Sequence, residues 1–167
     1  MNIVLIGMPT AGKSTVGVIL AKMLGYQFID TDLIIQQEEK KLLKDIIEEQ
    51  GIEGFLEVEN RINANIDTDC AVIATGGSAI YGMEAMEHLR KIGLVVYIRL
   101  SYGTIMNRLN NAKQRGVVLK NHQTLKDLYE ERCPLYEGYA HYVVDAENMD
   151  IEGLVNFIYN WINIQNS

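Results

Sequence analysis

Short apolar runs alternate along this chain with longer segments that repeat their apolar residues at helical spacing. The first run, Ile3–Ile6, is uninterrupted, which is typical of a strand buried on both faces. The segment that follows, Ser14–Leu24, has helical periodicity and stops at Gly25. We therefore predict βαβ units with strands at Ile3–Ile6, Tyr26–Asp30, Ala71–Thr75, Leu94–Leu100 and Tyr142–Asp145.

The connection between the second and third strands is long and carries two amphipathic patterns. Leu33–Gln50 is predicted to be one helix with a charged, solvated face, and Gly51–Asp67 is predicted to be a second helix. One carboxylate lies among the apolar residues of that second helix, so it either reaches solvent or caps a neighbour, or it points into a site and orients a charged partner. The residues on this shared face are Phe55, Glu59, Ile62 and Ile66.

The segment Gly7–Ser14 fits the pattern G-x-x-x-x-G-K-[ST] and lies between a predicted strand and a predicted helix. In that context the loop N–H groups and the positive end of the helix dipole form a cradle for polyphosphate. The alternative is a glycine-containing turn with a surface lysine. Lys13 is expected to contact the β- and γ-phosphates of ATP, and Ser14 to ligate Mg²⁺. The expected nucleotide-contacting residues of the loop are Gly7, Thr10, Ala11, Gly12, Lys13, Ser14 and Thr15.

The expected fold is α/β, a three-layer P-loop NTPase fold in which helices flank a five-stranded parallel sheet. With 167 residues the chain has the length of one domain, so residues 1–167 are predicted to form a single P-loop domain. Its helical substrate-binding part is expected at about residues 32–67 and a mobile lid at about residues 110–121.

Two aspartates follow the second predicted strand and so share the sheet edge with the phosphate loop. Asp32 is placed to accept a proton from an attacking hydroxyl, and Asp30 to hold a water bound to Mg²⁺. The alternative is that the pair caps the next helix. After the third strand, Gly76 and Gly77 would let backbone N–H groups approach a ligand, unless they form a plain turn.

The polar segment 110–121 contains two lysines and Arg115 and has little periodicity. Beside a phosphate loop, such a segment favours a lid that brings positive charge over bound phosphates. The alternative is a plain surface connection.

Composition narrows the classes of partner. A formal charge of −7 and a pI near 5.0 argue against a nucleic-acid partner, which calls for a basic face. No apolar run approaches the ~20 residues that span a bilayer, and no basic leader precedes the first strand, so we expect no membrane partner and a cytoplasmic location. The expected partner is a small-molecule alcohol. The sequence does not fix the oligomeric state, and a monomer is the expectation.

Cysteine and histidine add no chemistry to this picture. Cys70 and Cys133 match neither a disulfide framework nor a metal site and are expected to be reduced. The three histidines are scattered without ligand spacing, so no metal site with protein nitrogen ligands is expected.

Six segments of the chain occur in the order of a known pattern: Gly7–Thr15, Phe28–Asp32, Gly51 with Phe55 and Glu59, Gly76–Gly77, Arg108 with Arg115, and Arg132–Tyr136. With these segments the chain resembles, over nearly its whole length, the shikimate kinase family, whose members move the γ-phosphate of ATP to a hydroxyl of shikimate in aromatic amino acid biosynthesis. The resemblance implies that Asp32 holds the substrate hydroxyls, Arg132 its carboxylate, Arg108 the adenine and Arg115 the phosphates. Catalysis would then rest on Lys13, Asp32 and Arg115.

Two positions depart from the family pattern. Leu56 replaces an arginine that shares the substrate carboxylate, and the loss of a charged hydrogen bond, ~1.5–3 kcal/mol, would weaken a carboxylate ligand roughly 10- to 150-fold. Asn60 and Asn63 would offer neutral hydrogen bonds instead. Ser78 replaces a glycine and puts a side chain where the substrate meets the backbone. The expected substrate-binding residues are Asp32, Leu56, Gly76, Gly77, Ser78 and Arg132.

These departures leave alternatives to shikimate. One is another polar alcohol, such as homoserine or a sugar acid, and a second is a nucleotide-binding relative without turnover. A GTPase-like switch fits poorly, because the D-x-x-G sequence at Asp150–Gly153 follows the last strand and no N-K-x-D motif occurs.

Overall fold

The computed structural model describes residues 1–111 and 117–165. In this part of the chain one sheet contains five parallel strands in the order β2-β3-β1-β4-β5. The parallel pairing and the helical connections confirm the predicted α/β fold class. The strands are β1 (Asn2–Ile6), β2 (Gln27–Asp30), β3 (Ala71–Ala74), β4 (Gly93–Arg99) and β5 (Tyr142–Asp145).

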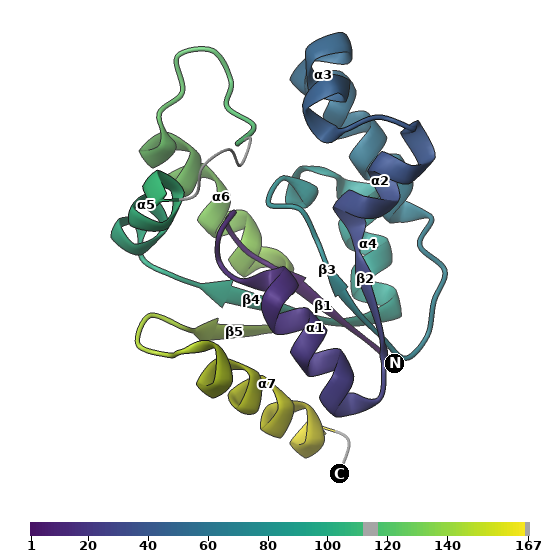
Figure 1. The fold of residues 1–167 in the computed structure, drawn as a ribbon, viewed down its shortest axis with the longest axis vertical. Coiled ribbons are helices and arrows are strands. Elements are labelled where there is room, and N and C mark those ends of the chain that lie inside the picture. Colours follow the sequence, from purple (N-terminus) through teal and green to yellow (C-terminus); the bar gives the residue numbers. More distant parts are fainter. Residues whose placement is uncertain (112–116, 166–167) are drawn as a thin grey trace.

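Helices cover both faces of the sheet, which gives the molecule its three layers (Figure 1). The first and last helices pack against each other on one face, and the fourth and sixth lie against β4. The helices are α1 (Lys13–Leu24), α2 (Thr31–Glu39), α3 (Leu43–Ala64), α4 (Met83–Ile92), α5 (Tyr102–Asn111), α6 (Leu125–Tyr139) and α7 (Ile151–Gln165), with a short 3₁₀ turn, η1, at Ala79–Tyr81.

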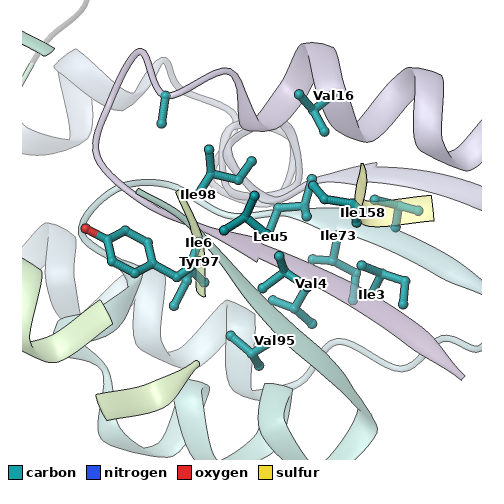
Figure 2. Packing of buried hydrophobic residues seen from close by; sticks show 14 of the residues in the cluster. Ile3, Val4, Leu5, Ile6, Val16, Ile73, Val95, Tyr97, Ile98 and Ile158 are labelled. Carbon is teal, nitrogen blue, oxygen red and sulfur yellow. The ribbon is translucent and has the colours of Figure 1, made fainter. Parts of the chain in front are cut away.

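The central strand β1 is buried along its whole length. Val4 lies beside Ile73 of β3 and Val95 of β4 in the parallel register, so these three side chains share one face of the sheet. On the other face, Leu5 packs in the layer that contains Val16 of α1 (Figure 2). Burial on both faces explains why residues Ile3–Ile6 of β1 are an unbroken run of apolar residues.

The prediction of a single helix over Leu33–Gln50 was wrong, because the structure breaks this segment between Glu39 and Leu43. Lys40 adopts a left-handed conformation, with φ 54° and ψ 35°, and closes α2 through its backbone N–H. The Gln36 side chain then accepts a 3.2 Å hydrogen bond from the N–H of Leu43 at the start of α3. Lysine rarely takes this conformation, so the sequence carries no signal for the break.

The predicted boundary at Gly51 is present as a kink inside α3. Gly51 has φ 73° and ψ 178°, a backbone conformation that side chains disfavour, and the helix continues beyond it.

The helical part of the chain that contains α2 and α3 projects beyond the carboxyl ends of the strands (Figure 1). A second apolar cluster holds this part together and contains Ile35, Ile46, Phe55, Val58 and Ile62.

Within residues 1–111 and 117–165, every helix is too short or too polar to cross a lipid bilayer.

The close packing of α1 on β2 can be tested at Gly17. A Cβ added there would lie 2.7 Å from Cε2 of Phe28, so we expect Gly17→Ala to lower the free energy of unfolding by about 1–3 kcal/mol. Gly138→Ala is the matched control, because this helical position has nothing within 4 Å, and it should raise stability by about 0.5–1 kcal/mol. Urea unfolding measures both. Equal stabilisation by the two variants would contradict the packing argument.

Candidate active site

A cavity of about 990 Å³ opens at the carboxyl ends of the strands. Its walls come from the loops after β1, β2 and β3, from α3, α5 and α6, and from residues 117–119. This is the edge at which parallel sheets bind ligands, because the loops that follow neighbouring strands meet there. The predicted site residues on its walls are Thr10, Gly12, Lys13, Ser14, Thr15, Asp30, Asp32, Gly76, Gly77, Ser78, Arg108 and Arg132.

The phosphate loop is organised around the ammonium group of Lys13. Its Nζ donates hydrogen bonds of 2.7 and 2.8 Å to the carbonyl oxygens of Gly7 and Met8, and the side chain is only 8% exposed. The loop therefore carries its own cation at its centre. Gly7 and Ala11 do not line the cavity, and a Cβ at Gly7 would lie 2.8 Å from the carbonyl oxygen of Ile98.

The loop is also attached to α5. The guanidinium of Arg108 donates a 3.0 Å hydrogen bond to the carbonyl oxygen of Thr10. Thr10 has φ 69°, which is uncommon for a residue with a branched side chain. Arg108, predicted to contact the adenine, is thus placed on α5, whereas Arg115, the predicted lid arginine, lies outside the described residues.

Asp30 joins the end of β2 to the first turn of α1. Its Oδ2 accepts a 3.0 Å hydrogen bond from the Ser14 hydroxyl, and its Oδ1 accepts one of 3.0 Å from the N–H of Asp32. Asp30 is thus the N-cap of α2 and a neighbour of Ser14 at the same time. A hydroxyl and a carboxylate are hard oxygen ligands of the kind that Mg²⁺ prefers, and Mg²⁺ usually keeps several waters and phosphate oxygens besides.

The glycine pair after β3 is required by close approach. A Cβ at Gly76 would lie 2.8 Å from Oε2 of Glu59 and 2.9 Å from Oδ1 of Asp32. A Cβ at Gly77 would lie 3.0 Å from Nη1 of Arg132. Two carboxyl groups therefore flank Gly76, and the guanidinium lies against Gly77.

Arg132 is a cation buried inside the cavity wall, with 1% of its surface exposed. Its Nη2 donates a 3.3 Å hydrogen bond to the carbonyl oxygen of Val118, and its guanidinium lies 5.4 Å from the ring centre of Tyr81. In the part of the chain that the structure describes, no carboxylate forms an ion pair with it. A buried guanidinium of this kind favours an anionic ligand.

Glu59 points into the site rather than to solvent. Of the two interpretations that the sequence allowed, this orientation agrees with the one that places the carboxylate in a site. It is 2% exposed and lines the cavity, and its Oε1 accepts a 2.6 Å hydrogen bond from the Ser78 hydroxyl. Burial, which disfavours the charged form, raises the pKa of Glu59 to about 7. Asp32 raises it further, whereas Ser78, Arg132 and Lys13 oppose the shift.

Leu56 and the two asparagines lie elsewhere. Leu56 is half-buried against the second apolar cluster and does not line the cavity. Asn60 is engaged with α4, since it donates to Glu84 at 2.9 Å and accepts from the N–H of Ala85 at 2.9 Å. Asn63 is fully buried, and neither of its amide atoms has a partner among residues 1–111 and 117–165.

The list of expected site residues contained neither Glu59 nor Lys44. Glu59 did carry a signal, a carboxylate on an apolar helix face. Lys44 lies in the first turn of α3 and lines the cavity. In the sequence it follows a helix break that no residue type signals, so it cannot be told from the other surface charges.

Comparisons with known proteins agree with this geometry. The family model described as Shikimate kinase matches residues 9–163. A shikimate kinase of Sulfurihydrogenibium sp. is 37% identical over 136 residues, 81% of this chain and 82% of the relative. One of Thiobacillus denitrificans is 33% identical over 166 residues, 98% of this chain and 91% of the relative.

Solved structures give the same result. The shikimate kinase of Acinetobacter baumannii, determined in complex with shikimate, has a TM-score of 0.89 and 32% identity and covers 98% of this chain and 93% of its own. A deoxyadenosine kinase of M. mycoides, at 16% identity and a TM-score of 0.64, covers 98% of this chain and 99% of its own and shares the fold. By these matches the chain belongs to the shikimate kinase family and is an ATP-dependent small-molecule kinase.

Proposed function

We propose that this protein transfers the γ-phosphoryl group of ATP to a hydroxyl of shikimate and so forms shikimate 3-phosphate. One observation carries the proposal: a single cavity joins the phosphate loop around Lys13 to the buried guanidinium of Arg132, with Asp32 on the wall that they share. The neighbour of 32% identity that was determined with shikimate supports the choice of substrate.

The nucleotide is expected to bind at the phosphate loop. The loop N–H groups and the N-terminus of α1 attract the phosphates, and Lys13 turns from the carbonyl oxygens of Gly7 and Met8 to the β- and γ-phosphates. Arg108 lies beside Thr10, where it would contact the adenine, and Arg115 would contact the phosphates.

Mg²⁺ would be held by Ser14 and, through water, by Asp30. Their oxygens lie 3.0 Å apart and fit the preference of this ion for hard oxygen ligands. When bound, the ion supplies positive charge that screens the phosphate oxygens.

Shikimate would bind at the other end of the cavity. Arg132 receives its carboxylate, and the backbone at Gly76 and Gly77 approaches its ring closely because neither residue has a Cβ. Asp32 accepts the proton of the attacking hydroxyl and fixes the direction of its oxygen. A bond forms between this oxygen and the γ-phosphorus, the bond to the β-phosphate oxygen breaks, and ADP leaves. Lys13 stabilises the charge that moves to the phosphate oxygens.

A second cation for the substrate carboxylate is available on α3. Leu56 has no charge and packs in the apolar cluster, whereas Lys44 lies on the cavity wall. Within the described part of the chain, no carboxylate forms an ion pair with Lys44. We therefore assign to Lys44 an accessory role in holding the carboxylate, weaker than that of a buried arginine because the side chain is exposed.

The proposed function is tested by the rate of ADP release with ATP, Mg²⁺ and a panel of alcohols that contains shikimate, homoserine and sugar acids. We expect shikimate to give the highest kcat/KM and phosphorus NMR to show the 3-phosphate. A higher value for another alcohol would replace the substrate. Tight ATP binding with no ADP release from any alcohol would point to a relative without turnover.

Replacement of Lys13 should abolish most of the turnover. We expect Lys13→Met to lower kcat by on the order of 10²–10³, because the developing charge on the phosphate oxygens loses its central cation. Lys22→Met, on the exposed side of α1, is the control and should keep wild-type kcat. Steady-state kinetics with saturating shikimate measure both. Wild-type kcat in Lys13→Met would refute the role of the loop.

Replacement of Lys44 should affect one substrate only. We expect Lys44→Met to raise KM for shikimate about 2- to 5-fold, as for the loss of an exposed charge pair, with KM for ATP unchanged. Lys91→Met, an exposed lysine of α4 away from the cavity, is the control. An unchanged KM for shikimate in Lys44→Met would leave Arg132 as the sole cation for the carboxylate.

A further inference from the structure

Glu59 is a buried carboxyl group in the cavity wall that the proposed phosphoryl transfer does not use. It is 2% exposed, and its Oε2 has no hydrogen-bond partner in residues 1–111 and 117–165. Leaving a buried polar atom unpaired costs about 1–3 kcal/mol, more when the group is charged. A polar atom left unpaired in a cavity wall indicates that a ligand completes its hydrogen bonding.

The surroundings of Glu59 favour its neutral form. Oε2 lies 2.8 Å from the point that a Cβ of Gly76 would occupy, and Oδ1 of Asp32 lies 2.9 Å from the same point. The two carboxyl groups thus face each other across Gly76, where two negative charges would repel. No cation in the described part of the chain forms an ion pair with Glu59, and Leu56, one turn earlier on α3, offers no charge.

The hydrogen bond from Ser78 decides which oxygen carries the proton. The Ser78 hydroxyl donates to Oε1 at 2.6 Å, so Oε1 acts as an acceptor and the acidic proton belongs on Oε2. Burial raises the pKa of Glu59 to about 7 against the lowering effect of this hydrogen bond. Of the charged groups that act on Glu59, Asp32 on α2 raises the pKa, and Arg132 on α6 and Lys13 on α1 lower it. Asp30, Lys44 and Arg108 are the other charged groups on the cavity walls.

We propose that Glu59 is a specificity-determining residue that meets the substrate as a neutral carboxylic acid, held through Oε1 by Ser78 and directing the proton on Oε2 toward a substrate oxygen beside Asp32. Glu59 is then a donor and Asp32 an acceptor on the two sides of Gly76, a pair that suits a hydroxyl group between them. The identity of that substrate as shikimate rests on the function proposed above.

The neutral form also matters for an anionic substrate. A second ionised carboxylate beside Asp32 would repel the carboxylate of shikimate, and Arg132 would have to offset that repulsion. Protonation removes the repulsion and adds a donor. Ser78, which stands where the family pattern has a glycine, is the residue that fixes the orientation of this acid.

The test compares Glu59→Gln with Glu57→Gln, an exposed carboxylate on the same helix. Glutamine has the shape of the neutral acid and cannot ionise. KM for shikimate is measured from pH 6 to pH 8.5 with saturating ATP and Mg²⁺. If only the neutral form binds, the KM of the wild type should rise on the order of tenfold between pH 7 and pH 8.5, and Glu57→Gln should follow it. The KM of Glu59→Gln should stay flat and within about threefold of the wild-type value at pH 6, with kcat little changed.

Two results would overturn the proposal. A pH profile of KM in Glu59→Gln that matches the wild type would show that Glu59 does not control binding. A KM at pH 6 raised more than about tenfold, 1.4 kcal/mol, would show that the ionised carboxylate is the form that binds.

Ser78→Ala provides a further test, because the pH profile of KM would not shift if Ser78 had only a structural role. The Ser78 hydrogen bond opposes the rise in the pKa of Glu59, so its removal should raise that pKa and shift the increase in KM to higher pH. An unshifted profile in Ser78→Ala would contradict the assignment of Ser78 as the positioning residue.

A measurement without substrate separates failure of this inference from failure of the proposed function. The folded state holds the Glu59 proton more tightly than the unfolded state, so its contribution to stability is present at low pH and is lost as the pH rises from 4.5 to about 7. The urea midpoint of the wild type should fall relative to that of Glu59→Gln over this range. If shikimate is not turned over but the wild-type midpoint falls relative to that of Glu59→Gln, the proposed substrate is wrong and the inference about Glu59 stands. The KM test is then repeated with the alcohol that the panel identifies. If the midpoints run parallel from pH 4.5 to 8, the acid is not neutral and the inference fails.

Discussion

The burial of β1 on both faces is the constraint on which the rest of the molecule depends. Its residues pair with β3 on one side and β4 on the other, and helices cover both faces of the sheet. This strand cannot shift its register without exposing an apolar run to water. The loop that follows it is therefore fixed relative to the ends of β2 and β3, and so are the side chains of Lys13 and Asp32. The chemistry of the site follows from the position of one strand end.

Three ionisable groups are buried at this sheet edge, and each is compensated in a different way. Lys13 is bound by carbonyl oxygens of its own loop, Arg132 by a carbonyl oxygen and the ring of Tyr81, and Glu59 by the Ser78 hydroxyl. In the described part of the chain, Arg132 has no carboxylate partner and Oε2 of Glu59 has no hydrogen-bond partner, and burial without full compensation is costly. These unmet contacts support the proposed placement of the substrate carboxylate and hydroxyls at the end of the cavity that Arg132 and Glu59 line.

The sequence predicted those parts of the structure that depend on local pattern. The five strands and the phosphate loop were recognisable because apolar runs and fixed glycine spacing report backbone conformation directly. The break after Glu39 was missed because Lys40 takes a left-handed conformation that lysine seldom adopts. The hydrogen bond from Ser78 to Glu59 joins residues 19 apart in the sequence, and the position of Lys44 on the cavity wall depends on the missed break. Contacts of this kind arise from packing, which periodicity does not encode.

The hydrogen bond between Arg108 and Thr10 is a direct link between α5 and the phosphate loop. Because a guanidinium has five N–H donors, Arg108 can keep this bond and still offer other N–H groups to a ligand in the cavity that it lines. One side chain therefore fixes the position of a helix relative to a loop that lies 98 residues earlier in the sequence.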